Sequence, residues 1–271
     1  MKNENVKKLS LALGLTRRIV GVKFIFIKEE YDDIDLPEFK DKTTFCAMSQ
    51  RAMKGDVLKA NAKCFTCQGG SETFGMVDVD NYISSGKQFS TFRLYESAAV
   101  SRQALESITF IKQRIYGIVA GPLDEMEDAD VVMFLANGRQ MMRVIQGYTY
   151  RFGMAKNIGM IGNQGICSDL IARPYQLNDM NISVMCYGAR MHTKADDGEL
   201  GAGLPINLFD DLVTGVIQTV NSALGDPEKL ELMERLNSPD ELGIEIEFGK
   251  MYGSYTKGAK YDESLYRRKP E

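Results

Sequence analysis

Five cysteines are the residues of this chain best suited to chemistry, and they are spread along its length: Cys46, Cys64, Cys67, Cys167 and Cys186. Their number is odd, and a chain of 271 residues is long enough to fold without disulfide bonds. Disulfide frameworks belong mainly to small secreted domains. The five cysteines are therefore interpreted as thiols, thiolate metal ligands or redox groups.

The strongest local motif is the pair Cys64 and Cys67, which is followed by Gln68-Gly69-Gly70. A C-x-x-C pair places two sulfurs where one metal or cluster can bind both. Glycines beside it leave backbone N–H groups free to point at cluster sulfides, which makes Gly69 and Gly70 candidate cofactor-binding residues. A dithiol redox pair is the competing interpretation, although the double glycine is a poor start for the helix that such a pair opens.

Cys46 and Cys167 each fall at or near the start of an expected helix, where the positive end of the helix dipole lowers a thiol pKa and favours the thiolate. Cys186 is expected at the end of a strand over residues 182–186. Four or five sulfurs could converge if the two halves of the chain fold together. The alternative is that the cysteines are small buried core residues and bind no metal.

The ligand types available narrow the choice of metal. The chain has one histidine, His192, so a metal site must be built from sulfur alone. Zinc bound by four cysteines usually shows two close C-x-x-C pairs, whereas one pair with three scattered cysteines favours an iron–sulfur cluster. Any Ser-His-Asp or Cys-His arrangement would also have to use His192, which makes a hydrolase a minor hypothesis.

Two features could bind an anion beside the sulfurs. Gly159, Gly162 and Gly165 precede an expected helix start, where backbone N–H groups and the helix dipole point the same way. Arg190 follows Cys186 by four residues and could neutralise a cluster or clamp a carboxylate or phosphate. The alternatives are glycines that serve tight turns and an arginine paired with nearby acids. Gly165 and Arg190 are the candidate cofactor-binding residues of this region.

The elements that position these residues alternate between strand and helix, which predicts an α/β fold with a mixed sheet and flanking helices. The main expected elements are a helix at 5–15, a strand at 19–27, a helix at 44–54, strands at 115–123 and 129–136, and a helix at 138–153. We expect one compact domain over 1–249, with halves 1–125 and 126–224 that echo each other, closing helices at 225–236 and a loosely attached tail at 250–271.

Composition excludes several classes of protein. Hydrophobic residues make up 44% and charged residues 26% of the chain, and the net charge is −4, which is ordinary globular composition. Basic residues cluster only at 266–269, so nucleic acid is a poor candidate partner. No apolar run is long enough to span a bilayer and the N-terminus lacks a signal-peptide core, so we expect a cytoplasmic protein without a membrane partner. Fifteen methionines and no tryptophan are compatible with a reducing or anaerobic setting.

The order and spacing of several motifs resemble family 169 of the domains of unknown function, the uncharacterised ArCR family, from about residue 10 to residue 225. The matching motifs are Cys46 with Ala-Met-x-x-Arg-Ala-x-x-Gly, Cys67-Gln-Gly-Gly, Gly121-Pro122-Leu123, Ala129-Asp130-Val131-Val132, Cys167-Ser-Asp, Cys186-Tyr-Gly-Ala-Arg190 and Gly203-Leu204-Pro205. The resemblance brings no assigned reaction. It implies a protein of anaerobic bacteria and archaea in which Cys46, Cys67, Cys167 and Cys186 are the ligands and Cys64 is an addition.

The sequence therefore predicts an iron–sulfur protein of anaerobic metabolism, with a [4Fe–4S]-type cluster that serves electron transfer or acts on a small anionic ligand. Its expected partners are that ligand or a redox partner protein, and a homodimer is admissible. Two alternatives stay open. One is a metal-free small-molecule-binding protein with buried cysteines, and the other is a thiol or sulfur-transfer enzyme that uses Cys64 and Cys67. Whether the protein is an enzyme, and whether Cys64 is a ligand, are not decided by the sequence.

Overall fold

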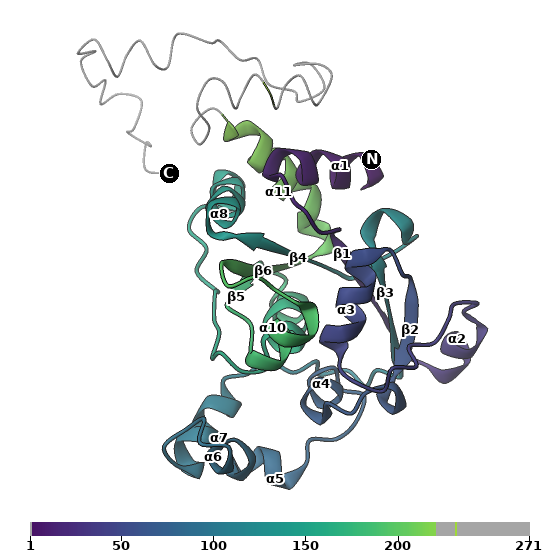
Figure 1. The fold of residues 1–271 in the computed structure, drawn as a ribbon, viewed down its shortest axis with the longest axis vertical. Coiled ribbons are helices and arrows are strands. Elements are labelled where there is room, and N and C mark those ends of the chain that lie inside the picture. Colours follow the sequence, from purple (N-terminus) through teal and green to yellow (C-terminus); the bar gives the residue numbers. More distant parts are fainter. Residues whose placement is uncertain (1, 221–230, 232–271) are drawn as a thin grey trace, which may run out of the picture. The chain divides into compact units, whose positions relative to one another are not determined.

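The structure is a computed structural model that describes residues 2–220 and residue 231 (Figure 1). Residues 2–220 belong to one compact unit. The tail at 250–271 lies outside the described residues, and so do the closing helices expected at 225–236 apart from residue 231. Within the described part of the chain, no helix is both long and apolar enough to cross a membrane.

A six-stranded sheet forms the centre of this unit, in the order β2-β3-β1-β4-β6-β5. The strands are β1 (Val20–Ile25), β2 (Leu58–Asn61), β3 (Gly117–Pro122), β4 (Val131–Asn137), β5 (Asn181–Ser183) and β6 (Glu199–Pro205). All five strand pairings are antiparallel, and two isolated bridges, Glu38 with Lys59 and Thr43 with Phe65, are parallel. The expected α/β fold with flanking helices is confirmed, whereas the sheet of the described residues is antiparallel instead of the expected mixed sheet.

One face of the sheet carries the cysteines and is called the cysteine face below. Alternate residues of β1, namely Val20, Val22 and Phe24, join a buried core cluster with side chains of α3 (Phe45–Lys54) and of a π-helix (Gly165–Ala172). Side chains of a strand alternate between its two faces, so this spacing defines which face is covered. Cys46, Cys64 and Cys167 belong to the same cluster, and Cys186 packs against it.

The long helices α1 (Lys2–Leu13), α8 (Gly138–Phe152) and α11 (Phe209–Gln218) pack together, and α8 packs on β4 and β6 (Figure 1). Gly147 and Gly215 let α8 and α11 approach closely, because a Cβ on Gly215 would lie 2.0 Å from the Gly147 carbonyl oxygen. The expected helix at 138–153 is confirmed as α8, and its N-cap Asn137 exchanges hydrogen bonds with Gln140.

The remaining helices are short: α2 (Lys28–Asp33), α4 (Gln68–Thr73), α5 (Asn81–Ser84), α6 (Lys87–Thr91), α7 (Ala98–Glu106), α9 (Arg173–Leu177) and α10 (Tyr187–Thr193). Five of them, α2, α4, α5, α6 and α10, occupy stretches without an expected element. Three turns of 3-10 helix lie at Ala62–Cys64, Leu123–Glu125 and Ile206–Leu208.

The two expected halves each supply three neighbouring strands, because β2, β3 and β1 lie beside β4, β6 and β5. The helices that follow the first strand of each half pack differently, however. Residues of α3 join the core cluster on the cysteine face, whereas α8 packs against α11. The repeat is therefore not confirmed and stays a prediction.

Candidate metal centre

Four cysteines are held at the beginnings of four helical segments on the cysteine face. Cys46 is the second residue of α3, Cys167 is the third residue of the π-helix, and Cys67 and Cys186 are the N-caps of α4 and α10. The helix expected at 44–54 begins one residue later, at Phe45, because Thr44 rather than Thr43 is its N-cap and the Thr44 side chain accepts a hydrogen bond from the Ala47 N–H at 3.1 Å. It ends at Gly55, whose φ of 122° suits glycine.

The thiols of these four cysteines lie close enough to act on one another electrostatically. Burial raises the pKa of Cys167 well above its ordinary value, and negative charge on Cys46, Cys67 or Cys186 raises it further. Burial likewise raises the pKa of Cys46, and charge on Cys186 or Cys67 adds to the effect. Like charges interact in this way only at short range or in a poorly solvated interior. These effects indicate that the four thiols, from segments up to 140 positions apart in the case of Cys46 and Cys186, lie within electrostatic reach of one another.

Backbone N–H groups point at two of the sulfurs. Cys67 is exposed, and the protein packed around its thiol raises the pKa, whereas N–H groups of Gly70 and Gly69 lower it by hydrogen bonding to the sulfur. The Cys186 sulfur accepts a hydrogen bond from the Ala189 N–H at 3.3 Å. The expected role of Gly69 and Gly70 as donors to a cofactor stays a prediction.

Gly165 allows the π-helix to approach the segment that carries Cys186. A Cβ at this position would lie 2.5 Å from the Cys186 nitrogen and 2.5 Å from the Met185 Cα, which no real side chain tolerates. The expected strand at 182–186 ends earlier, at Ser183. Met185 adopts a left-handed φ of 65°, so the chain turns out of the strand before it reaches Cys186.

Gln164 is a polar residue beside the cysteines that sequence reasoning missed. It is buried and precedes the π-helix in a left-handed conformation with a φ of 52°. Its Oε1 lies 2.8 Å from the Thr73 hydroxyl oxygen, and its Nε2, beside Gly69, is buried without a hydrogen-bond partner among the described residues. Its place in the sequence, among glycines and before an expected helix, did not distinguish it from any loop residue.

Cys64 faces different surroundings. It ends the 3-10 turn Ala62–Cys64, and its sulfur accepts a hydrogen bond from the Asn61 N–H at 3.5 Å. Burial raises its pKa, the Asn61 hydrogen bond opposes that effect, and Glu38 raises the pKa further. The residue lines a cavity of about 380 Å³ whose other charged members are Glu38, Lys40, Lys42 and Lys63. Its polar neighbours thus differ from those of the other four cysteines.

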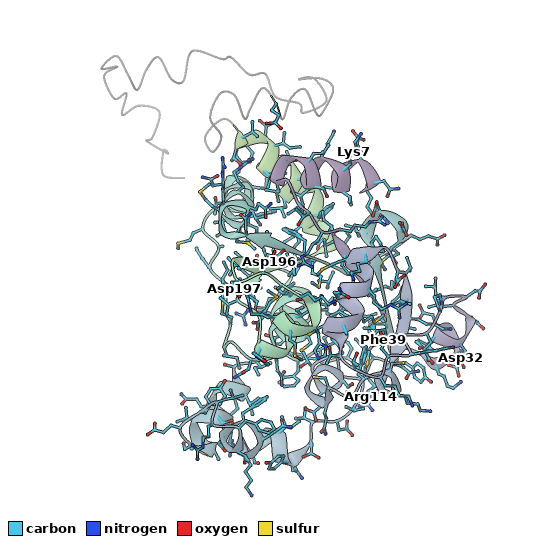
Figure 2. All side chains as sticks on the ribbon, in the orientation of Figure 1. Lys7, Asp32, Phe39, Arg114, Asp196 and Asp197 are labelled. Carbon is cyan, nitrogen blue, oxygen red and sulfur yellow. The ribbon has the colours of Figure 1, made fainter. Side chains whose placement is uncertain are left out.

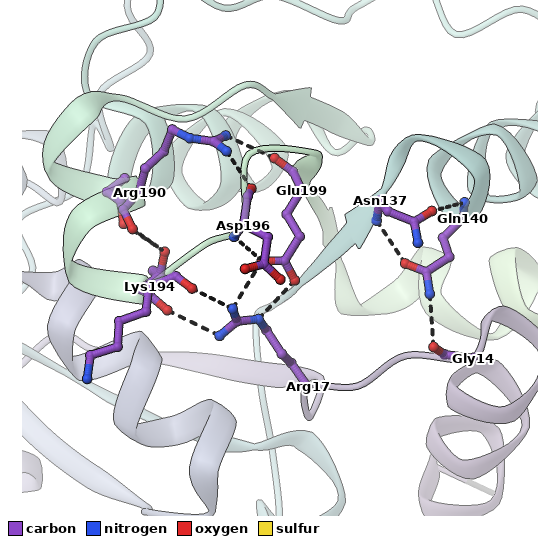
Figure 3. Close-up of polar contacts among 10 residues, drawn as sticks. Gly14, Arg17, Asn137, Gln140, Arg190, Lys194, Asp196 and Glu199 are labelled. Atoms are coloured by element: carbon purple, nitrogen blue, oxygen red, sulfur yellow. Dashed lines mark hydrogen bonds and ion pairs between the residues drawn. The ribbon is translucent and has the colours of Figure 1, made fainter.

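Arg190 binds backbone carbonyl groups around the loop that follows α10. Its Nη1 donates to the carbonyls of Val184 at 3.3 Å and Glu199 at 3.0 Å, and its Nη2 donates to that of Asp196 at 2.5 Å (Figure 3). Figure 2 shows Asp196 and its neighbour Asp197 on this loop. The contact to Asp196 is thus to its carbonyl rather than to its carboxylate. A cofactor-binding role for Arg190 stays a prediction.

Arg17 holds the same loop from the other end of the chain. Its Nε and Nη2 pair with the two carboxylate oxygens of Glu199 at 2.9 and 3.1 Å, and its Nη2 also donates to the Lys194 carbonyl at 2.6 Å (Figure 3). This bidentate pair is largely buried, with side-chain exposures of 21% and 10%. His192 lies in the last turn of the same helix α10.

Among the described residues, 2–220 and 231, no group of three or more His, Cys, Asp or Glu side chains is arranged so that it could hold a metal ion. The fold is that of an α/β protein in which four cysteines lie at or near the beginnings of helical segments. The chain belongs to family 169 of the domains of unknown function, described as uncharacterised ArCR, whose profile matches residues 8–215.

An uncharacterised protein of Methanocaldococcus jannaschii, MJ0308, is 24% identical over 220 residues, which cover 79% of this chain and 92% of that protein. No solved structure matches the chain. The family and this relative place the chain among proteins without an assigned reaction.

Proposed function

We propose that this protein binds a [4Fe–4S]-type cluster through Cys46, Cys67, Cys167 and Cys186 and serves electron transfer. The observation that carries the proposal is the grouping of these four thiols. They come from four separate segments, and negative charge on the others raises the pKa of Cys46 and Cys167, whereas Cys64 has Asn61 and Glu38 as neighbours.

A metal explains this grouping better than core packing does. Thiols with raised pKa values are inert, and a hydrophobic core has no need to gather four of them. Metal coordination would change their protonation state from thiol to thiolate, because a thiol that binds a metal loses its proton. The backbone N–H groups directed at the sulfurs of Cys67 and Cys186 favour negatively charged sulfur as well.

We favour a cluster over a single ion because the chain has one C-x-x-C pair and three scattered cysteines, whereas Cys₄ zinc sites usually have two close pairs. Four thiolates around one zinc ion lie only about 3.8 Å apart, as Zn–S bonds of about 2.3 Å in a tetrahedron require. Four irons and their sulfides hold their cysteine ligands further apart than that. A cubane also presents sulfides that accept hydrogen bonds, and the unpartnered Nε2 of Gln164 is a donor beside Gly69 that could reach such an acceptor.

Electron transfer is the role best suited to four cysteine ligands. When bound, such a cluster supplies one-electron chemistry at a potential set by its surroundings. Four cysteines give every iron a protein ligand, so the alternative role, action on a small anionic ligand, would require one cysteine to leave. Cys67 is exposed, and Tyr187, which follows Cys186 in α10, is 83% exposed, so a redox partner protein could approach the centre.

The proposal also includes the setting in which the protein works. Iron–sulfur clusters and free thiols persist in reducing surroundings, which favours the cytoplasm of an organism with anaerobic metabolism. A sulfur-transfer role for Cys64 and Cys67 is less well supported. Burial raises the pKa of both thiols, whereas a nucleophilic cysteine needs a lowered one.

The test is a metal analysis of the full chain, purified and reconstituted without oxygen. The proposal predicts about four irons and about four sulfides per chain, with broad visible absorption that bleaches on reduction. A content of one zinc ion per chain would instead indicate a Cys₄ zinc site and contradict the cluster. Protein that stays colourless and free of iron after reconstitution would contradict both the cluster and the electron-transfer role.

A further inference from the structure

A small polar cavity lies beside the π-helix that carries Cys167. It has a volume of about 260 Å³, and its lining includes Thr109, Gly159, Met160, Ser168, Asp169 and Arg173. None of the cysteines is among its lining residues. The π-helix thus contributes Cys167 to the sulfur group and the next two residues to a separate cavity, and π-helical turns occur frequently at functional sites.

Asp169 places a carboxyl group at this cavity. The residue is 4% exposed, and its Oδ2 accepts a hydrogen bond from the Ser183 hydroxyl at 2.6 Å. The backbone is fixed too, because the Asp169 carbonyl accepts a hydrogen bond from Asn181 Nδ2 at 2.8 Å. The second carboxylate oxygen, Oδ1, has no hydrogen-bond partner among the described residues, and so it is available to a ligand.

Arg173 places a guanidinium group at the same cavity. Its Nε and Nη2 donate to the Asn157 carbonyl at 3.0 and 2.8 Å, and its Nη1 contacts the Thr109 hydroxyl oxygen at 3.3 Å. A guanidinium has five N–H donors, so two are left for a ligand. Gly159 makes room for this group, because a Cβ there would lie 3.1 Å from the guanidinium carbon.

The two opposite charges are close without being paired. Both side chains line the same cavity, yet the described residues show no ion pair between the Asp169 carboxylate and the Arg173 guanidinium within 4 Å. A direct ion pair would satisfy both groups and leave neither charge available to bind a ligand. Separated charges in one small cavity instead complement a ligand that carries both signs of charge.

We propose that this cavity binds a free amino acid, with its ammonium group at Asp169 and its carboxylate at Arg173. The volume equals the share of about nine water molecules at 30 Å³ each, which suits a ligand of that size and excludes a nucleotide. The inference goes beyond the cluster, because no lining residue is one of the proposed cluster ligands.

Isothermal titration calorimetry on the full chain tests the proposal with the twenty free amino acids as probes. Each amino acid that binds is compared with the amine that lacks its carboxylate and with the acid that lacks its amine. We expect binding at one site per chain, weakened at least about tenfold by loss of either group. No heat from any amino acid at about 10 mM, ten times a 1 mM Kd, would overturn the proposal.

Variants of the cavity residues test whether the amino acid binds there. Asp169→Asn and Arg173→Gln should each weaken amino-acid binding at least about tenfold. The control is Asp124→Asn, which removes a surface acid paired with Arg18 at 2.7 Å and should leave binding unchanged. If Asp169→Asn does not fold, Gly159→Ala tests the same cavity by displacing the Arg173 guanidinium. Unchanged affinity in the folded cavity variants would place the amino acid elsewhere and overturn the assignment.

Iron content separates this inference from the proposed function. Asp169→Asn should keep the iron content of the parent chain while amino-acid binding falls. Cys67→Ser should keep amino-acid binding while iron is lost. Loss of amino-acid binding in the cysteine variant, with the fold intact by circular dichroism, would contradict an independent site.

Discussion

Gln164 and Thr73 join the two segments that carry Cys167 and Cys67. The Thr73 hydroxyl lies 2.8 Å from Oε1 of Gln164 and 2.6 Å from the Gly69 carbonyl oxygen, so its single hydrogen is shared between two acceptors. Thr73 ends α4, which begins after Cys67, and Gln164 precedes the π-helix of Cys167. A contact between residues 91 positions apart therefore sets how these two cysteine segments meet.

Gln164→Asn tests this contact. Asparagine tolerates the left-handed backbone at this position but is one methylene too short to reach Thr73. We expect the free energy of unfolding to fall by about 1 kcal/mol, as for loss of one buried hydrogen bond. Urea denaturation measures it. Gln176→Asn is the control, because Gln176 contacts Gln113 at 3.0 Å on the surface, and a loss as large in the control would contradict the account.

Gly165→Ala should separate the π-helix from Cys186. The new Cβ would lie 2.5 Å from backbone atoms of Met185 and Cys186, and backbone cannot move aside as a side chain can. We expect loss of at least about 2 kcal/mol in the free energy of unfolding, together with reduced iron binding on reconstitution. Gly188→Ala is the matched control, since a Cβ at Gly188 in α10 meets nothing within 4 Å. Equal stability of the two variants would contradict the close approach.

Arg190→Ala distinguishes a structural arginine from one that acts on a cofactor. Three carbonyls around the loop after α10 would lose a charged donor, so we expect the free energy of unfolding to fall by about 2 kcal/mol or more. Thermal and urea denaturation of the metal-free chain measure it. Arg102→Ala removes an exposed arginine paired with Glu106 and should have little effect. Full stability with lowered iron content would instead assign Arg190 to the cofactor.

Glu72 predicts a pH dependence of stability. Burial raises its pKa above the ordinary 4.5, and its Oε2 is buried without a hydrogen-bond partner. As pH rises above 4.5, the unfolded chain loses this proton before the folded chain does, so the group's contribution to stability falls until pH exceeds the folded pKa.

Glu72→Gln removes that titration. The free energy of unfolding of the variant, relative to the parent chain, should therefore increase as pH rises from about 4.5 to about 7. Urea denaturation at a series of pH values measures the difference. The exposed Glu106→Gln is the control. A difference that does not change with pH for Glu72→Gln would contradict the effect of burial on this carboxyl.

Local signals in the sequence predicted the elements whose ends are marked by capping residues. Gly55 ends α3 as expected, the N-cap is Thr44 rather than the expected Thr43, and the spacing of apolar residues identified α8. The start of α3 also placed Cys46 correctly in a first helical turn. Such signals act within a few residues of each other, so a sequence reports them directly.

The central strand β6 was missed because glycines replace the apolar residues that mark a strand. Gly201 and Gly203 lie against Leu170 of the π-helix, where a Cβ would come within 2.2 Å of its Cδ1 or 2.0 Å of its carbonyl oxygen. Glycine is needed there because a segment some thirty positions away packs against the strand. In the sequence, however, glycine is a turn signal, so the strand was not predicted.

The cysteine group was predicted as a set of candidates, but its internal contacts were not. The grouping of Cys46, Cys67, Cys167 and Cys186 follows from tertiary packing that no spacing encodes. Asp169 and Arg173 were overlooked for the same reason, because they matter through a cavity that also needs Gly159 and Thr109 from other segments.

The most direct test of the central claim is the iron content of serine variants at each cysteine, reconstituted without oxygen and checked for folding by circular dichroism. The account predicts that Cys64→Ser keeps about four irons per chain, as in the parent, and that serine at Cys46, Cys67, Cys167 or Cys186 lowers the content sharply. Equal loss in Cys64→Ser and Cys67→Ser, or full iron content in all five variants, would contradict a cluster held by these four thiols.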